Sequence, residues 1–120
     1  PYTRQFQFHL LNNNIYLNRR LFKFKIIDSP RCSFCQLRQE TIEHFFLQCT
    51  ETRQIWTDLT SWWSQKINTD ELLLTDEKIL IGTTEDETHS ELLDTLLIDT
   101  KIELYHARKI GSPPSIKKII

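Results

Sequence analysis

Apolar residues recur at helical spacing over much of the chain. The clearest stripe lies within residues 51–67, where apolar side chains repeat every three or four positions: Ile55, Trp56, Leu59, Trp62, Trp63 and Ile67. This spacing predicts an amphipathic helix. A short helix over 76–81 and the longest helix, over about 90–109, are predicted further on, with Thr75 and Ser90 as their N-caps.

The N-terminal part carries weaker patterns. Residues 4–12 fit either a helix or a short strand, and we favour the helix. Three asparagines at 12–14 then predict a break. Asn18 is expected to cap a short basic helix that runs through Lys25, with three apolar residues on or near its buried side: Leu21, Phe22 and Phe24.

Composition supports one folded domain. The chain has 120 residues, 39% of them hydrophobic, and 13 are aromatic. Two glycines and no hairpin dipeptides argue against an all-β fold. No apolar run approaches the roughly 20 residues that span a bilayer. Because the chain begins at Pro1 and holds no methionine, we expect a segment of a longer polypeptide.

The cysteines carry the most specific signal. Cys32, Cys35, His44 and Cys49 read C-x2-C-x8-H-x4-C and use every cysteine of the chain. Three thiolates and one imidazole complete a tetrahedral set for a structural Zn²⁺, with no position left for water or substrate. Thr41 stands where the N-cap of a helix carrying His44 belongs. Cys49, five residues on, lies off the face shared by i and i+4, so we expect it to bind where that helix unwinds.

Two other interpretations of these residues exist. The thiols could be unrelated buried side chains beside a surface histidine, or two of them could form a disulfide that leaves one unpaired. No secretion signal favours the disulfide, so we place the chain inside the cell, in the reducing nucleus or cytoplasm. The fold expected is an all-α domain of five or six helices with a CCHC zinc knuckle near its N-terminal third. Within the single domain 1–120, basic helices occupy 1–28, the knuckle 29–49, and a helical body with a basic tail 50–120.

Charge is distributed unevenly around a net value of −1. Residues 1–38 carry a net +6, residues 39–100 a net −11, and residues 101–120 a net +4. Such asymmetry suggests a basic face for an anionic partner, although the blocks could also neutralise each other within one fold. The candidate nucleic-acid contacts are cations and a ring near the knuckle: Arg19, Arg20, Lys23, Lys25, Arg31, Phe34 and Arg38. The plainer alternative is that the arginines offset the −1 charge of a three-thiolate zinc site.

No constellation of catalytic residues is present, so we expect no enzyme activity in this segment. An acidic loop with Glu85, Asp86, Glu87 and His89 could hold a divalent cation, but a solvated charge cluster explains it more simply. The tryptophans could stack on bases, yet their helical spacing favours packing in the core.

Several of these motifs together resemble the zinc-binding region that closes the reverse transcriptase of LINE-type (non-LTR) retrotransposons. The resemblance rests on Leu21–Ile26, Ser29–Cys35, Glu40–Phe46, Cys49 and Ile55-Trp56, within about residues 6–63. It implies that the parent polypeptide carries an endonuclease and a reverse transcriptase upstream. It also implies a non-catalytic module that engages element RNA or target DNA during target-primed reverse transcription, and it places the metal ligands on the CCHC residues. A host protein derived from such an element is a further possibility.

Two functions follow as hypotheses. The first is a zinc-dependent domain that holds RNA or DNA, single-stranded or at a nicked site, with little sequence readout. The second is a zinc-stabilised scaffold that docks on the polymerase or on a host protein. One continuous basic strip would favour the first, and scattered cations paired with Asp and Glu would favour the second.

Overall fold

The computed structural model describes residues 2–67, 74–82 and 90–114, and these residues form helices and loops without a strand. The helices are α1 (Tyr2–Leu11), α2 (Asn18–Lys23), the π-helix η1 (His44–Gln48), α3 (Thr50–Ile67), α4 (Asp76–Ile81) and α5 (Ser90–Ala107). The predicted all-α class with five or six helices is therefore confirmed for the described part of the chain.

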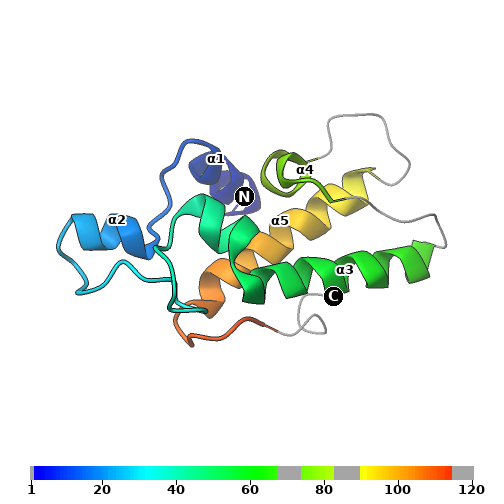
Figure 1. Ribbon diagram of the computed structural model, residues 1–120. Helices are drawn as coiled ribbons and strands as arrows, with labels where there is room; N and C mark the ends of the chain where they lie inside the picture. Colours follow the sequence, from blue (N-terminus) through cyan, green and yellow to red (C-terminus); the bar gives the residue numbers. More distant parts are fainter. Residues whose placement is uncertain (1, 68–73, 83–89, 115–120) are drawn as a thin grey trace.

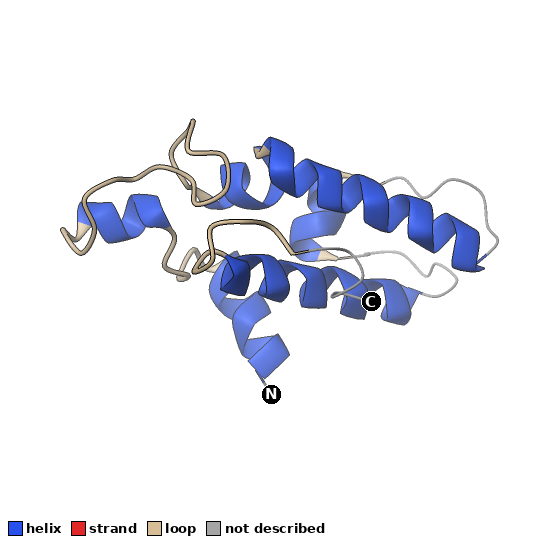
Figure 2. Cartoon of the chain, turned by 90° about the horizontal axis from the view of Figure 1, so that it is seen from below, coloured by secondary structure: helices blue, strands red, loops and turns tan. Residues whose placement is uncertain are grey.

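The two long helices, α3 and α5, form the body of the molecule (Figure 1). Helix α1 contacts α5, and η1 contacts both α3 and α4. Helix α2 stands at one end of the molecule, joined to the body by loops on both sides, as both views show (Figure 2). None of the described helices has the length and apolar character needed to cross a membrane.

One hydrophobic core joins every helix except α2. Helix η1 contributes Phe45 and Phe46 to its centre, where their rings meet edge to face at 4.9 Å. Helix α3 contributes two tryptophans, Trp56 and Trp63, each 5% exposed, which confirms that these rings pack in the core. Helix α2 has no buried residue, so its position depends on polar contacts and not on burial of apolar surface.

The prediction for α2 was wrong in three respects. Its N-cap is Leu17 and not Asn18, whose side chain instead reaches the zinc knuckle. The helix ends at Lys23, because Lys25 adopts a left-handed φ of 62°. Phe22 and Phe24 are 44% and 55% exposed and do not face a core.

The other helix boundaries follow the sequence closely. The structure confirms a helix over the first residues and a Thr75 N-cap whose hydroxyl accepts from the Lys78 N–H at 3.2 Å. Helix α5 begins at Ser90 and ends at Ala107, two residues before the expected end. The acidic loop with Glu85, Asp86, Glu87 and His89, interpreted above as a solvated charge cluster, and the part of the basic tail from residue 115 on lie outside the described residues.

Candidate metal centre

The first two cysteines lie in a tight turn closed by a short bridge. Arg31 and Gln39 form an isolated antiparallel β-bridge, and the Cys32 N–H donates to the Arg38 carbonyl at 2.7 Å. The chain reverses at Gln36, whose φ is 61° and whose N–H donates to the Cys32 carbonyl at 3.1 Å. The turn therefore carries both thiols on its inner side, as expected of a C-x2-C knuckle.

The other two ligand candidates come from the π-helix. The Thr41 hydroxyl accepts from the His44 N–H at 3.1 Å, which confirms its capping role. His44 begins η1, and its carbonyl accepts from the Cys49 N–H at 2.7 Å, a bond that spans five residues. This wider turn brings positions i and i+5 to one side, whereas an α-helix would separate them. Cys49 follows in extended conformation, so the chain unwinds there as predicted.

These four side chains converge on one point. The sulfur atoms of Cys32, Cys35 and Cys49 and a ring nitrogen of His44 all lie within 4.8 Å of one another. The Sγ atoms of Cys32 and Cys49 are 3.8 Å apart, and Cys35 Sγ is 3.3 Å from His44 Nε2. A tetrahedral Zn²⁺ with usual bond lengths separates two sulfurs by about 3.8 Å and sulfur from nitrogen by about 3.6 Å. The donors therefore fit a zinc ion, and the three cysteines form no disulfide.

Burial acts to raise the pKa values of the metal-free Cys32 and Cys35 thiols, and hydrogen bonds act to lower them. Burial raises the pKa of the Cys32 thiol to about 12. Burial also acts to raise the pKa of Cys35, but hydrogen bonds from the backbone N–H groups of Leu37 and Arg38 lower it overall. Burial, and then the nearby Arg38 cation, lower the pKa of His44 and favour the neutral ring that a metal requires. Zinc binding must therefore displace thiol protons, above all from Cys32.

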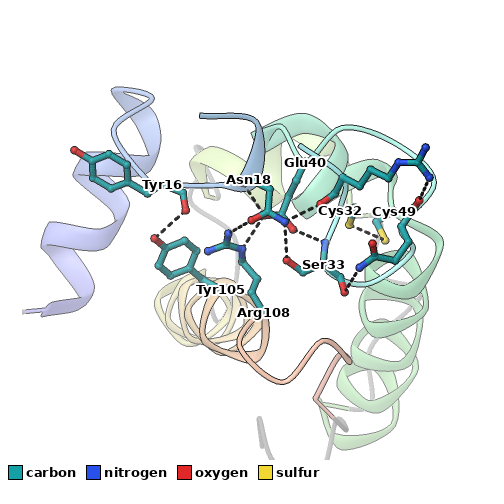
Figure 3. Close-up of polar contacts among 10 residues, drawn as sticks. Tyr16, Asn18, Cys32, Ser33, Glu40, Cys49, Tyr105 and Arg108 are labelled. Atoms are coloured by element: carbon teal, nitrogen blue, oxygen red, sulfur yellow. Dashed lines mark hydrogen bonds and ion pairs between the residues drawn. The ribbon is translucent and has the colours of Figure 1, made fainter. Parts of the chain in front are cut away.

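The buried carboxylate of Glu40 links the knuckle to the rest of the fold through hydrogen bonds and an ion pair (Figure 3). Glu40 is fully buried, and its Oε2 accepts from the Ser33 N–H at 2.6 Å. Its Oε1 accepts from the Asn18 N–H at 2.9 Å and from Arg108 Nε at 2.8 Å. One carboxylate thus joins the cysteine turn, the start of α2 and the end of α5. We did not anticipate this role from the sequence, although Glu40 belongs to the motif that carries the resemblance.

The amide of Asn18 strengthens the same junction. Its Nδ2 donates to the Arg31 carbonyl at 2.7 Å and to Ser33 Oγ at 3.2 Å, while its Oδ1 accepts from Arg108 at 2.7 Å. The Arg19 N–H adds a bond of 3.3 Å to the Glu40 carbonyl. Polar contacts at the first turn of α2 therefore hold this helix to the knuckle.

The predicted basic residues fall into two groups. Arg19, Lys23 and Lys25 are exposed on or next to α2. Arg20 lies in the same helix, but its guanidinium stacks over the rings of Tyr16 at 4.7 Å and Phe24 at 5.8 Å. It also donates to the Asn13 carbonyl at 2.8 Å, so it anchors the loop before α2.

The second group lies on the knuckle itself. Arg31 is exposed and donates to the Gln36 carbonyl at 3.3 Å, and Arg38 is exposed beside a cavity of about 310 Å³ that Cys35 also lines. Phe34 is half-buried and packs on Phe45 with ring centroids 5.1 Å apart, so it belongs to the edge of the core. Within residues 2–67, 74–82 and 90–114, none of the six candidate cations pairs with a carboxylate.

A comparison with known families agrees with this geometry. Residues 1–56 match the model of a family described as zinc-binding in reverse transcriptase. This stretch is similar to a zinc-binding domain of reverse transcriptases. The match covers just under half of the chain and includes all four converging side chains. The domain that this family describes is an accessory one, not a catalytic one. Together with the cluster, it supports one structural Zn²⁺ in a domain associated with reverse transcriptase. No curated protein and no solved structure matches the chain.

Proposed function

We propose that this chain is a non-catalytic, zinc-dependent nucleic-acid-binding domain at the C-terminal end of a LINE-type reverse transcriptase. Zn²⁺ held by Cys32, Cys35, His44 and Cys49 orders the knuckle, and the knuckle positions a basic surface. That surface contacts the phosphate backbone of element RNA or target DNA during target-primed reverse transcription. The partner on the protein side is the upstream polymerase domain of the same polypeptide.

The observation that carries the proposal is the way α2 is attached to the zinc knuckle. The helix buries no side chain, yet its first turn is bound to the knuckle through Asn18 and Glu40. A helix of six residues that buries no side chain gains little order from apolar packing, so the zinc turn supplies the fixed point. The exposed cations on or next to this helix are Arg19, Lys23 and Lys25.

Charge supports an anionic partner. Within the described residues these cations form no ion pair with a carboxylate, so they remain available to an anionic partner. Arg31 and Arg38 extend the positive region onto the knuckle. Clustered cations without local counterions are what phosphate contacts require. The three free thiols fit a reducing compartment, so we place the domain in the nucleus or cytoplasm.

A salt titration with matched charge variants tests the proposal. We expect the affinity of the zinc-loaded protein for a nucleic-acid strand to fall steeply with salt. Arg19→Glu with Lys23→Glu should weaken binding by at least tenfold, since each change replaces a phosphate-facing cation with an anion. The control is Arg53→Glu with Lys66→Glu, two exposed positions on α3 that carry the same change of charge.

The competing function is a scaffold that docks on protein. Leu37 is 81% exposed on the knuckle and offers an apolar contact that a protein partner could cover. If the α2 and α3 charge variants weaken binding equally, or binding does not depend on salt, the nucleic-acid proposal is wrong. A Leu37→Ser variant that lost affinity for the polymerase domain would then support the scaffold.

A further inference from the structure

An open groove lies beside α2. It has a volume of about 1050 Å³, and its lining comes from α1, α2, α4 and the segments that precede α2 and η1. The end of α1 contributes Leu11 and the end of α4 contributes Ile81, both more than half exposed. We call this space the α2 groove.

The wall formed by α2 combines charge with an aromatic ring. Arg19, Phe22 and Lys23 all line the groove, and their spacing of three and four residues places them on one face of the helix. Phe24 lines it as well, just past the helix end. Among the described lining residues, Glu43 is the one exposed acid, whereas Arg19 and Lys23 are exposed cations. Positive charge therefore dominates the wall.

The two phenylalanines of this wall are exposed to solvent. Phe22 is 44% exposed and Phe24 is 55% exposed, whereas Phe45 and Phe46 are fully buried in the core. The Arg20 guanidinium lies over the Phe24 ring, 5.8 Å from the ring centroid. A surface that combines exposed apolar rings with cations suits a ligand that alternates negative charges with flat apolar groups.

We infer that the α2 groove binds unpaired nucleotides, with bases packed against Phe22 and Phe24 and phosphates at Arg19 and Lys23. The inference rests on the proposed function and narrows it from nucleic acid in general to single-stranded segments. In a duplex the bases stack on one another, so their faces cannot cover the rings. A duplex would meet the cations alone and leave Phe22, Phe24, Leu11 and Ile81 in water.

The test compares one sequence as a single strand and as a duplex, by fluorescence anisotropy at fixed salt with the zinc-loaded protein. The variant is Phe22→Ala with Phe24→Ala, which removes exposed rings and should leave the fold intact. The matched control is Phe8→Ala on α1, an aromatic side chain that is 62% exposed and does not line the groove. We expect the paired variant to lose at least tenfold in single-strand affinity, because it removes both rings on which bases stack, with duplex affinity changed less than twofold.

The outcomes separate this inference from the proposed function. If the ring variant binds both forms as well as the wild type does, while Arg19→Glu with Lys23→Glu still weakens binding, the groove inference is overturned and the proposed function stands. If neither set of changes matters, both fail. If the ring variant instead loses affinity for the polymerase domain and keeps that for the single strand, the groove is a protein-docking site and the inference is again wrong.

Discussion

The junction at Glu40 gives the sharpest test of how the knuckle is joined to the fold. We consider Glu40→Gln, which keeps the size of the side chain and removes its charge. The carboxylate accepts three hydrogen bonds, from the backbone N–H groups of Ser33 and Asn18 and from Arg108. A glutamine can offer only one oxygen, so its NH₂ group must face at least one of these donors.

The cost can be worked out from these contacts. Arg108 is only 13% exposed, so the change leaves a guanidinium with its partner carboxylate missing, and removal of one partner of a buried pair typically costs about 3–5 kcal/mol. The retained amide oxygen and the Arg108 bond to Asn18 Oδ1 offset part of this loss. We therefore expect about 3 kcal/mol of lost stability, at the low end of that range.

Urea unfolding of the zinc-saturated protein measures this cost. Glu43→Gln is the control, because Glu43 is exposed three residues away and its change should fall within about 0.5 kcal/mol of the wild type. A double-mutant cycle with Arg108→Met should return a coupling of at least about 1 kcal/mol. A Glu40→Gln variant as stable as the Glu43→Gln control, or a coupling near zero, would refute the reasoning.

Two further predictions concern the body of the domain. Lys101 is 1% exposed and donates to Gln7 Oε1 at 2.8 Å and to the Leu80 carbonyl at 3.1 Å, and burial lowers its pKa from 10.5 to about 8. Because the unfolded chain holds this proton up to higher pH, the free energy of unfolding should rise between pH 8 and 10.5, by up to about 3 kcal/mol. In urea melts across this window, Lys101→Met should remove that rise, and an unchanged slope would contradict the assignment. Trp56→Phe should cost about 1–3 kcal/mol in the same assay, since Trp56 Nε1 donates to the buried Phe46 carbonyl at 2.7 Å, and a smaller loss would mean that water replaces the bond.

Much of the fold could be predicted because local signals decided it. The stripe on α3, the Thr75 cap and the C-x2-C turn each depend on residues close together in the sequence. The four ligand candidates could be predicted for a different reason, since metal coordination restricts both residue types and spacing. The convergence of these side chains is thus the strongest success of the sequence interpretation.

The rest depended on contacts between distant segments. Nothing local indicates that Asn18 serves the knuckle instead of its own helix, because Arg31 and Arg108 complete its contacts from 13 and 90 residues away. The exposure of Phe22 and Phe24 could not be predicted either, since apolar residues near helical spacing normally indicate a buried face. Similarly, the sequence could not distinguish Arg20, which stacks on Tyr16, from the free cations beside it.

The central claim is that three sulfurs and one imidazole hold the ion that organises this domain, and zinc K-edge X-ray absorption tests it most directly. The account predicts one Zn²⁺ per chain with three sulfur neighbours at about 2.3 Å and one nitrogen neighbour at about 2.0–2.1 Å. A metal-free protein that keeps its native structure, or a zinc shell with two sulfurs or with an oxygen from water, would contradict it.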